Sequence, residues 1–380
     1  MTEPKEKQGT PDQKEPGDQQ GPAQDLFRHR PLKLYPFYAG AGAGGDIKIP
    51  NGSTQLEVLE RGPNLDHRLS IFTGNAHPDF ARRVCEVLGV ELGGVDVFEF
   101  SNENIFVRYH SSIRAHDVFI IQSIASPVNR SLMELFIMLD AARRASADRI
   151  TAVIPYYAYG RTDKKDQPRV PITARLIADF LQVAGANRVV TMDLHAGQIQ
   201  GFFTIPVDEL TAFFTLAEYV RTRRLLNPVV VAADIGIAKR ARNFAEYLGV
   251  PTAIIEKRRS PSGTGVEVLT VIGDVAGRDA VIFDDEIDTA GTMVRAAEAL
   301  LAAGVRSVYA VATHGVFSGP AIQRLSTGPF EEVVVTDTLP LPPEKRIPKI
   351  TVLSVAPLFA EAIRRIHLGL SIGEMYEVLI

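Results

Sequence analysis

Residues 284–292 have the types and the spacing that would bind a phosphorylated sugar. They read DDEIDTAGT, they follow an apolar run at 280–283, and a helical pattern begins at Met293. Small residues at a strand-to-helix turn let backbone N–H groups approach a phosphate, and paired carboxylates accept hydrogen bonds from vicinal hydroxyls. Asp284 and Asp285 are therefore predicted to bind the ring hydroxyls of a ribose whose 5-phosphate lies on the turn. The residues expected to contact this sugar phosphate are Asp284, Asp285, Asp288, Thr289, Ala290, Gly291 and Thr292.

A simpler interpretation of the same stretch is an acidic strand end followed by an ordinary helix cap. Asp288 or Thr289 would then accept a hydrogen bond from the first turn of the helix. A cap alone does not need two further acids and a Gly-Thr turn, so the binding interpretation is favoured. The sequence has no G-x-x-x-x-G-K-[ST] phosphate loop that could compete for this role.

Three further segments place reactive side chains after predicted strands. EKRR at 256–259 precedes SPSGTG at 260–265, and a Gly/Ser/Pro-rich stretch beside cations is typical of a mobile lid. His195 and Asp234 each follow an apolar, β-branched run. Because Mg²⁺ prefers oxygen ligands, Asp234 is the more straightforward metal contact of the two.

These residues require a scaffold that ends several strands at one edge. Short β-branched runs alternate with helical patterns from Leu69 onward, which predicts an α/β fold with mainly parallel sheets flanked by helices. Strands are expected at 69–72, 95–100, 117–121, 150–154, 188–192, 229–233, 279–283 and 307–312.

Two long stretches of the chain resemble each other. The stretches that begin at Val118 and Ala280 both read as strand, loop, long helix, Ala-rich end and second strand. A repeat of this length indicates duplication of a whole α/β unit. The first copy has Gln122-Ser123 where the second has Asp284-Asp285, so only the second unit is predicted to hold the sugar phosphate.

Composition bounds the class of protein. A chain of 380 residues that is 46% hydrophobic can form about two domains. A formal charge of -4 provides no global basic field for nucleic acid, and no apolar run is long enough for a membrane helix. The lone Cys85 suits a reducing compartment, and the expected location is cytoplasmic. The expected division is a disordered tail and extension (1–66), a first unit (67–211), a second unit (212–370) and a tail packing on the first unit (371–380).

Several motifs resemble those of a known family. DDEIDTAGT resembles the phosphoribosyl-binding motif shared by phosphoribosyltransferases and ribose-phosphate pyrophosphokinases. IPYYAYGRTDKKDQPRVPITAR, TMDLHAGQIQGFF, IEKRR and THGVFSGPA are similar to segments of the pyrophosphokinases alone. The likeness runs from about Ser70 to about His367, and the chain is identified by it as a member of that family.

The resemblance implies a reaction and an assembly. A pyrophosphokinase of this family transfers the pyrophosphoryl group of Mg-ATP to the anomeric hydroxyl of ribose 5-phosphate, which gives phosphoribosyl pyrophosphate and AMP for nucleotide biosynthesis. The resemblance further implies two phosphoribosyltransferase-like domains, dimers assembled to a homohexamer, and ATP bound between neighbouring subunits. The ATP loops would belong to the first unit.

The resemblance also implies roles for individual residues. Lys257 and Arg259 would be the catalytic cations of a flexible loop, and His195 and Asp234 would contact Mg²⁺. A regulatory anion site would involve Ser112, Arg114 and Arg169. The residues expected to bind ATP are Phe100, Asn102, Asn104, Arg161, Thr162, Asp166 and His195.

Departures from the family pattern gather on the nucleotide side. The adenine loop has Glu103-Asn104, the ATP loop has Arg161-Thr162 in place of Arg-Gln, and the turn at 233–237 lacks one glycine. The end of the chain, 371–376, is only loosely similar. An alternative is therefore a catalytically weak regulatory homologue that assembles with an active enzyme, and a phosphoribosyltransferase is a third, less favoured one. The retained lysine and arginine of 256–259 favour an active pyrophosphokinase.

Overall fold

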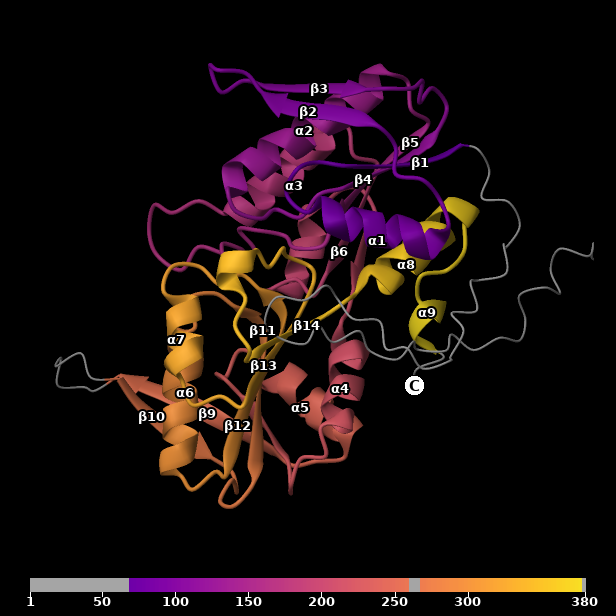
Figure 1. The fold of residues 1–380 in the computed structure, drawn as a ribbon. Helices are drawn as coiled ribbons and strands as arrows, with labels where there is room; N and C mark the ends of the chain where they lie inside the picture. Colours follow the sequence, from indigo (N-terminus) through magenta and orange to yellow (C-terminus); the bar gives the residue numbers. More distant parts are fainter. Residues whose placement is uncertain (1–67, 260–266, 378–380) are drawn as a thin grey trace, which may run out of the picture.

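The computed structural model describes residues 68–259 and 267–377. The predicted disordered tail at 1–66 and the predicted lid at 260–265 lie outside these residues. Within the described part of the chain, two large sheets are stacked end to end, and they fall on either side of the predicted boundary at 211–212 (Figure 1).

The first sheet is parallel throughout and buried between helices. Its strands lie in the order β1 (Leu69–Thr73), β4 (Asp117–Ile121), β5 (Arg149–Ile154), β6 (Arg188–Met192) and β7 (Val207–Leu210). Strand β4 is buried at every residue, as a doubly covered parallel strand requires. The elements that accompany this sheet are α1 (Pro78–Leu88), α2 (Val128–Arg144), α3 (Thr173–Ala184) and the short 3₁₀ helix η2 (Gly197–Phe202).

The second sheet has seven strands, and only its edge strand is antiparallel. The order is β10 (Glu267–Ile272), β9 (Thr252–Arg259), β8 (Val229–Ala232), β11 (Asp279–Ile287), β12 (Ser307–Gly315), β13 (Glu332–Thr336) and β14 (Ile350–Leu353). Strand β10 pairs antiparallel with β9. The helical elements of this half are α4 (Phe213–Thr222), α5 (Ala238–Leu248), α6 (Gly291–Ala302), α7 (Ala321–Thr327), η3 (Pro343–Lys345), α8 (Ala356–Leu368) and α9 (Glu374–Glu377).

The predicted duplication is visible as two strand-helix-strand units. Strands β4 and β5 are parallel neighbours joined through α2, and β11 and β12 are parallel neighbours joined through α6. The expected α/β fold with parallel sheets is confirmed. Strand β11 is longer than predicted, because it pairs with β12 as far as Ile287 opposite Gly315. Asp284 and Asp285 therefore lie inside the strand and not in the loop that the sequence indicated.

The run at 95–100 was expected to join the parallel sheet, and this expectation is wrong. Strand β2 (Val95–Glu99) instead pairs antiparallel with β3 (Ile105–Tyr109) in a separate two-stranded ribbon at one end of the molecule (Figure 1). The connection of five residues is too short for a parallel crossover and suits a hairpin. No residue of β2 is fully buried, in contrast to β4.

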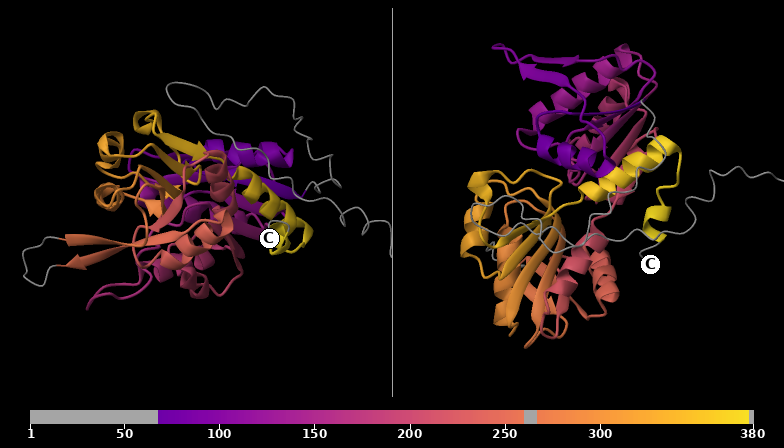
Figure 2. Two further views of the ribbon diagram at one scale, coloured as in Figure 1. Left: turned by 90° about the horizontal axis from the view of Figure 1, so that it is seen from below. Right: turned by 45° about the vertical axis from the view of Figure 1, so that its right-hand side comes forward.

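Helix α8 crosses from the second half of the chain to the first sheet. It lies beside α1, where the rings of Phe359 and Phe80 meet edge to face at 5.4 Å (Figure 2). Its last turn contacts the first sheet, since Nδ1 of His367 lies 2.8 Å from a carboxylate oxygen of Asp117. The predicted second unit, which ends at residue 370, contains this helix, and the apolar face of the helix packs against α1 of the first unit.

Replacing Phe359 with alanine should lower the free energy of unfolding by about 3–5 kcal/mol, since the ring is completely buried in the shared core. Urea titration followed by circular dichroism would measure the loss. Leu368→Ala, at the exposed end of the same helix, should cost only about 0.5 kcal/mol. Equal effects of the two substitutions would contradict the packing of α8 on α1.

No helix in the described part of the chain combines the length and the apolar character that spanning a bilayer requires.

Candidate functional site

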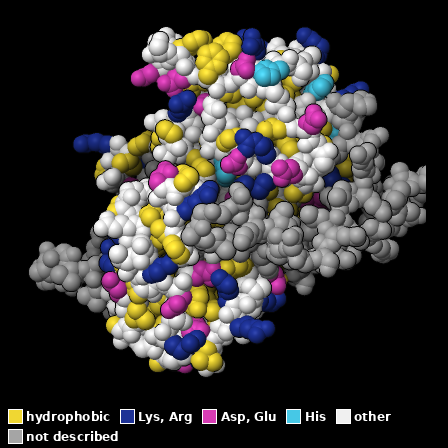
Figure 3. Space-filling model, viewed as in Figure 1, with side chains coloured by type: hydrophobic (Ala, Val, Ile, Leu, Met, Phe, Trp, Pro, Cys, Tyr) yellow, Lys and Arg dark blue, Asp and Glu magenta, His cyan; other side chains and the backbone are white. Residues whose placement is uncertain are grey.

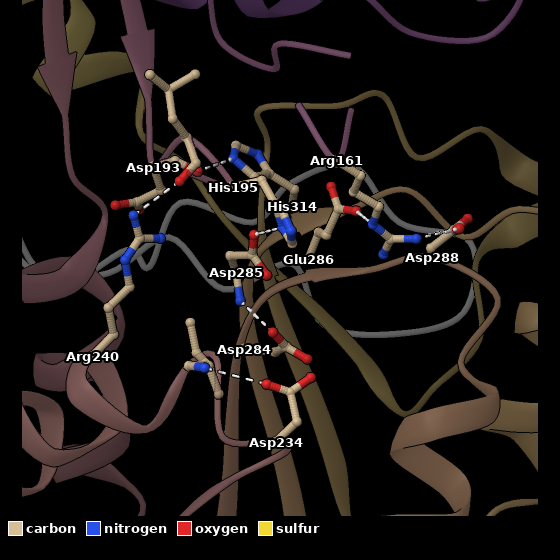
Figure 4. A network of polar contacts seen from close by, with 12 residues as sticks. Arg161, Asp193, His195, Asp234, Arg240, Asp284, Asp285, Glu286, Asp288 and His314 are labelled. Carbon is tan, nitrogen blue, oxygen red and sulfur yellow. Dashed lines mark hydrogen bonds and ion pairs between the residues drawn. The ribbon is translucent and has the colours of Figure 1, made fainter. Parts of the chain in front are cut away.

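The candidate site lies at the carboxyl end of β11, which extends beyond its neighbour β8. Pairing with β8 stops at Phe283 opposite Ala232, whereas pairing with β12 continues. The next three residues of β11, Asp284, Asp285 and Glu286, therefore lie along an edge that β8 leaves open. Ligands of open α/β sheets bind at the carboxyl ends of the strands. Side chains from the first sheet face these acids across the gap between the two halves (Figure 4).

His195 and Asp285 form the central contact between the two halves. Nδ1 of His195 lies 2.6 Å from a carboxylate oxygen of Asp285, which is buried. Burial alone would raise the pKa of Asp285, but hydrogen bonds with His195 and Asp284 outweigh it and hold the pKa at about 2. The same hydrogen bond raises the pKa of His195, although partial burial opposes the shift. Asp284 behaves differently, because burial and the neighbouring carboxylates raise its pKa well above the usual range.

The contribution of the His195–Asp285 pair to stability should depend on pH through the protonation of His195. The pKa of His195 is raised above its unfolded value of roughly 6.5. The pair therefore contributes stability that is fully present below that pH and is lost as the pH rises through the folded pKa. Asp285→Asn should move the pKa of His195 downward, as followed by NMR titration of the imidazole signals, with His195→Gln to assign the resonance. An unchanged titration in Asp285→Asn would contradict the contact.

The turn that follows β11 leads directly into α6. Helix α6 begins at Gly291, and its N-cap residue Ala290 is in the left-handed conformation with φ 58°. Among the described residues no side chain caps this helix, so the cap at Asp288 or Thr289 considered above does not form. The first N–H groups of a helix need an acceptor, and a phosphate supplies one.

Two residues of the segment after β12 support the turn. Ser318 donates a hydrogen bond to the carboxylate of Asp288, and a guanidinium N–H of Arg324 donates to the carbonyl oxygen of Thr289 at 2.9 Å. Gly291 lies so close to Arg324 that a Cβ would be 3.1 Å from its Nη1. Sequence reasoning marked the segment THGVFSGPA as family-like but assigned no role to Ser318 or Arg324.

The side chain of Arg161 reaches from the first half of the molecule to the predicted sugar-phosphate strand. Its Nε forms an ion pair with Glu286, and its Nη1 lies 3.0 Å from a carboxylate oxygen of Asp288. The structure therefore joins the predicted ATP loop to the predicted sugar-phosphate strand. Thr162, its neighbour, donates its hydroxyl to the carbonyl oxygen of Tyr159 at 2.7 Å, within the same loop.

A second set of hydrogen bonds joins the two halves of the molecule beside the site. Thr313 of β12 donates its hydroxyl to Asp193, the residue that follows β6, at 2.7 Å. The ring of His314 lies 3.1 Å from the carbonyl oxygen of Met192. These interactions join residues about 120 positions apart, so no local pattern could have revealed them. A cavity of about 240 Å³ lies beside them, lined by Asp193, Thr211, Phe213, Arg240, Asn243, Phe283, Asp284, Asp285 and Thr313.

Other predicted residues lie away from this centre. Phe100 follows the ribbon strand β2, is 49% exposed and packs against Phe98 with ring centroids 5.1 Å apart. Figure 3 shows hydrophobic side chains gathered over the ribbon. In the same loop the side chain of Asn102 accepts a hydrogen bond from the backbone of Asn104. Four further predicted residues are exposed and make none of the contacts described around His195 and Asp285: Ser112, Arg114, Asp166 and Arg169.

The predicted catalytic cations lie on β9. The backbones of Lys257 and Arg259 pair with Leu269 and Glu267 of β10, so both belong to a strand and not to a loop. Their side chains lie outside the described residues. Strand β9 continues past its last pairing with β8, Ile254 opposite Ala232, toward the same edge that exposes the acids of β11.

The acids of the site are candidate ligands for a cation. Asp234 follows β8, and its carboxylate accepts a hydrogen bond from the backbone of Ile237. It lies close enough to Asp284 to help raise the pKa of that residue. In the described part of the chain no three His, Cys, Asp or Glu side chains are arranged to hold a metal ion by themselves. The carboxylate oxygens of Asp234 are donors of the kind that Mg²⁺ prefers.

Two α/β halves with mainly parallel sheets, a carboxylate pair and an uncapped small-residue turn at a strand end are typical of the phosphoribosyl-binding class of protein. Residues 69–185 match the model of the N-terminal domain of ribose phosphate pyrophosphokinase, and residues 264–377 match the phosphoribosyl synthetase-associated domain. The chain belongs to the ribose-phosphate pyrophosphokinase family, so the predicted family and enzyme class are confirmed.

Individual relatives support the assignment over nearly their whole length. The chain is 56% identical over 309 residues to a ribose-phosphate pyrophosphokinase of Caldanaerobacter subterraneus subsp. tengcongensis, a match that covers 81% of this chain and 98% of the relative. It is 52% identical to the enzyme of Clostridium acetobutylicum, covering 83% and 99%. A crystal structure of phosphoribosylpyrophosphate synthetase from Mycobacterium smegmatis superposes with a TM-score of 0.76 at 45% identity, covering 80% of this chain and 99% of that one.

Proposed function

We propose that the chain transfers the pyrophosphoryl group of Mg-ATP to the anomeric hydroxyl of ribose 5-phosphate, which yields phosphoribosyl pyrophosphate and AMP. The observation that carries this proposal is the contact of His195 with Asp285. It brings the predicted nucleotide side and the predicted sugar-phosphate side within hydrogen-bonding distance.

Ribose 5-phosphate would occupy the open edge of β11 and the start of α6. Asp284 and Asp285 accept hydrogen bonds from the ring hydroxyls, and the N–H groups at Gly291 and Thr292 bind the phosphate. One carboxylate oxygen of Asp285 already contacts His195, so Asp285 offers its other carboxylate oxygen to the sugar.

The nucleotide would be held mainly through its phosphates. The anomeric oxygen attacks the β-phosphorus, and the bond between this phosphorus and the α-phosphate oxygen breaks. The protein contributes alignment and positive charge to such a reaction. Lys257 and Arg259 would stabilise the transferring group, and Arg161 would contact the triphosphate. Asp234 and His195 would hold Mg²⁺, which when bound neutralises phosphate charge.

The aromatic ribbon would serve a neighbouring subunit. Phe100, Asn102 and Asn104 belong to the connection between β2 and β3, and Figure 1 shows this ribbon at one end of the molecule, away from β6, the strand that precedes His195. This separation favours a homo-oligomer, built of dimers up to a hexamer, in which the ribbon binds the adenine at another subunit. We also propose that Ser112, Arg114 and Arg169 form a regulatory anion site and that Thr162 and Asp166 lie near the bound ATP. The proposed location is the cytoplasm, without nucleic-acid or membrane partners.

The proposal is tested by the release of AMP from Mg-ATP by the purified protein, with and without ribose 5-phosphate. Release that depends on the sugar phosphate is expected. ATP and ribose 5-phosphate left unchanged by a folded protein would favour the regulatory homologue. Thr162 supports that alternative, because its hydroxyl donates a hydrogen bond to the carbonyl oxygen of Tyr159 within its own loop.

A further inference from the structure

Glu286 is a buried carboxylate whose partners both come from the other half of the molecule. Its two oxygens contact Nε of Arg161 and the hydroxyl of Tyr156, the latter at 3.1 Å. Tyr156 and Arg161 both lie in the connection between β5 and α3. A buried carboxylate is strongly disfavoured unless it is paired, so these two contacts hold the loop against β11.

The ion pair also determines how Arg161 is presented. Its guanidinium uses Nε for Glu286 and Nη1 for Asp288, and the three side chains lie in a row in Figure 4. A guanidinium is a rigid planar fork, so fixing two of its nitrogens fixes the direction of the third. The side chain remains 51% exposed, which leaves it accessible to an incoming anion.

The two carboxylates differ in what they can do during the reaction. Asp288 belongs to the turn that would bind the sugar phosphate, and it also accepts a hydrogen bond from Ser318. Glu286 precedes the turn, inside β11, and is occupied by the two residues of the nucleotide loop. Glu286 is therefore the anchor of Arg161 that need not rearrange when the sugar phosphate binds.

We propose that Glu286 is a positioning residue, which holds Arg161 at the junction of the two substrate sites and thereby sets the affinity for Mg-ATP. This inference rests on the proposed function, in which Arg161 contacts the triphosphate. Glu286 acts only through Arg161 and does not itself contact a substrate.

The test is a double-mutant cycle on the full chain, with the dissociation constant of Mg-ATP measured by calorimetry and KM values measured by AMP release. Glu286→Gln keeps the volume and can still accept from Tyr156, but it loses the ion pair. It should weaken Mg-ATP binding roughly 10-fold and change the KM of ribose 5-phosphate less than about twofold. In an Arg161→Ala background the same substitution should have an effect below about twofold. An equal effect in both backgrounds would overturn the inference.

Glu332 offers a matched control. It is also a buried strand carboxylate that pairs with an arginine, Arg223, and accepts from a tyrosine, Tyr219, at 2.6 Å, but it lies at the opposite end of the second sheet. Glu332→Gln should leave Mg-ATP binding unchanged, and a loss equal to that of Glu286→Gln would mean that general destabilisation explains both. If Glu286→Gln does not fold, Glu286→Asp, which withdraws the charge by one methylene, takes its place with the same expectation.

Calorimetry separates this inference from the proposed reaction. A chain that binds Mg-ATP but releases no AMP would refute the reaction, while the cycle on the dissociation constant would still decide the role of Glu286. A wild-type chain that does not bind Mg-ATP at all would overturn the inference itself.

Discussion

Replacing Lys257 with alanine is expected to lower kcat by roughly two to three orders of magnitude, with a much smaller change in the KM of either substrate. Charge develops on the transferring group only as the reaction proceeds, so a cation that meets this charge acts on turnover more than on binding. The backbone of Lys257 lies on β9 beyond its pairing with β8, at the edge where the acids of β11 are exposed. Initial rates of AMP formation over a matrix of both substrates would measure the two parameters.

Arg258→Ala provides the control, since it removes a neighbouring positive charge from the same strand. It should change kcat by less than about threefold. An unchanged kcat in Lys257→Ala would show that Lys257 is not one of the catalytic cations, and equal losses in both variants would point to the net charge of the strand.

Asp285→Asn is the second substitution with a large expected effect. The sequence alone predicts that the affinity for ribose 5-phosphate falls more than the affinity for ATP, because one sugar acceptor is removed. The structure adds a loss on the nucleotide side, because Asp285 is also the partner of His195. A charged hydrogen bond contributes about 1.5–3 kcal/mol, so each side should weaken roughly 10- to 100-fold.

Substrate dissociation constants for ribose 5-phosphate and for Mg-ATP would separate the two losses. Asp274→Asn makes the same chemical change at an exposed carboxylate that pairs with Arg278 and should alter neither constant. A loss for ribose 5-phosphate alone would show that the contact with His195 does not position the nucleotide. No loss for either substrate would refute the assignment of Asp285 as a sugar ligand.

The parallel architecture could be predicted because its signals are local. Buried strands such as β4 are uninterrupted apolar runs, and the repeat of strand, helix and strand is legible along the chain. The position of the carboxylate pair after 280–283 could be predicted for the same reason. The ribbon was missed because a short apolar run looks the same whether its partner is a parallel strand or a hairpin.

The remaining features depend on tertiary contacts. An amphipathic helix such as α8 does not specify which half of the molecule it will cover, and its contact with α1 emerges only on folding. Glu286 and Arg161 lie in separate motifs, and their ion pair follows from the way the two halves meet. The sequence could not predict that α6 begins without a side-chain cap, because Asp288 and Thr289 are both ordinary cap residues. In the structure Asp288 instead pairs with Arg161 and accepts a hydrogen bond from Ser318.

The reaction itself is tested most directly by phosphorus NMR of the products formed from Mg-ATP and ribose 5-phosphate. Equal amounts of AMP and of a ribose phosphate that carries a diphosphate on its anomeric carbon are expected, because both terminal phosphoryl groups move as one unit. ADP together with a singly phosphorylated anomeric carbon, or substrates left unchanged by a folded protein, would contradict pyrophosphoryl transfer.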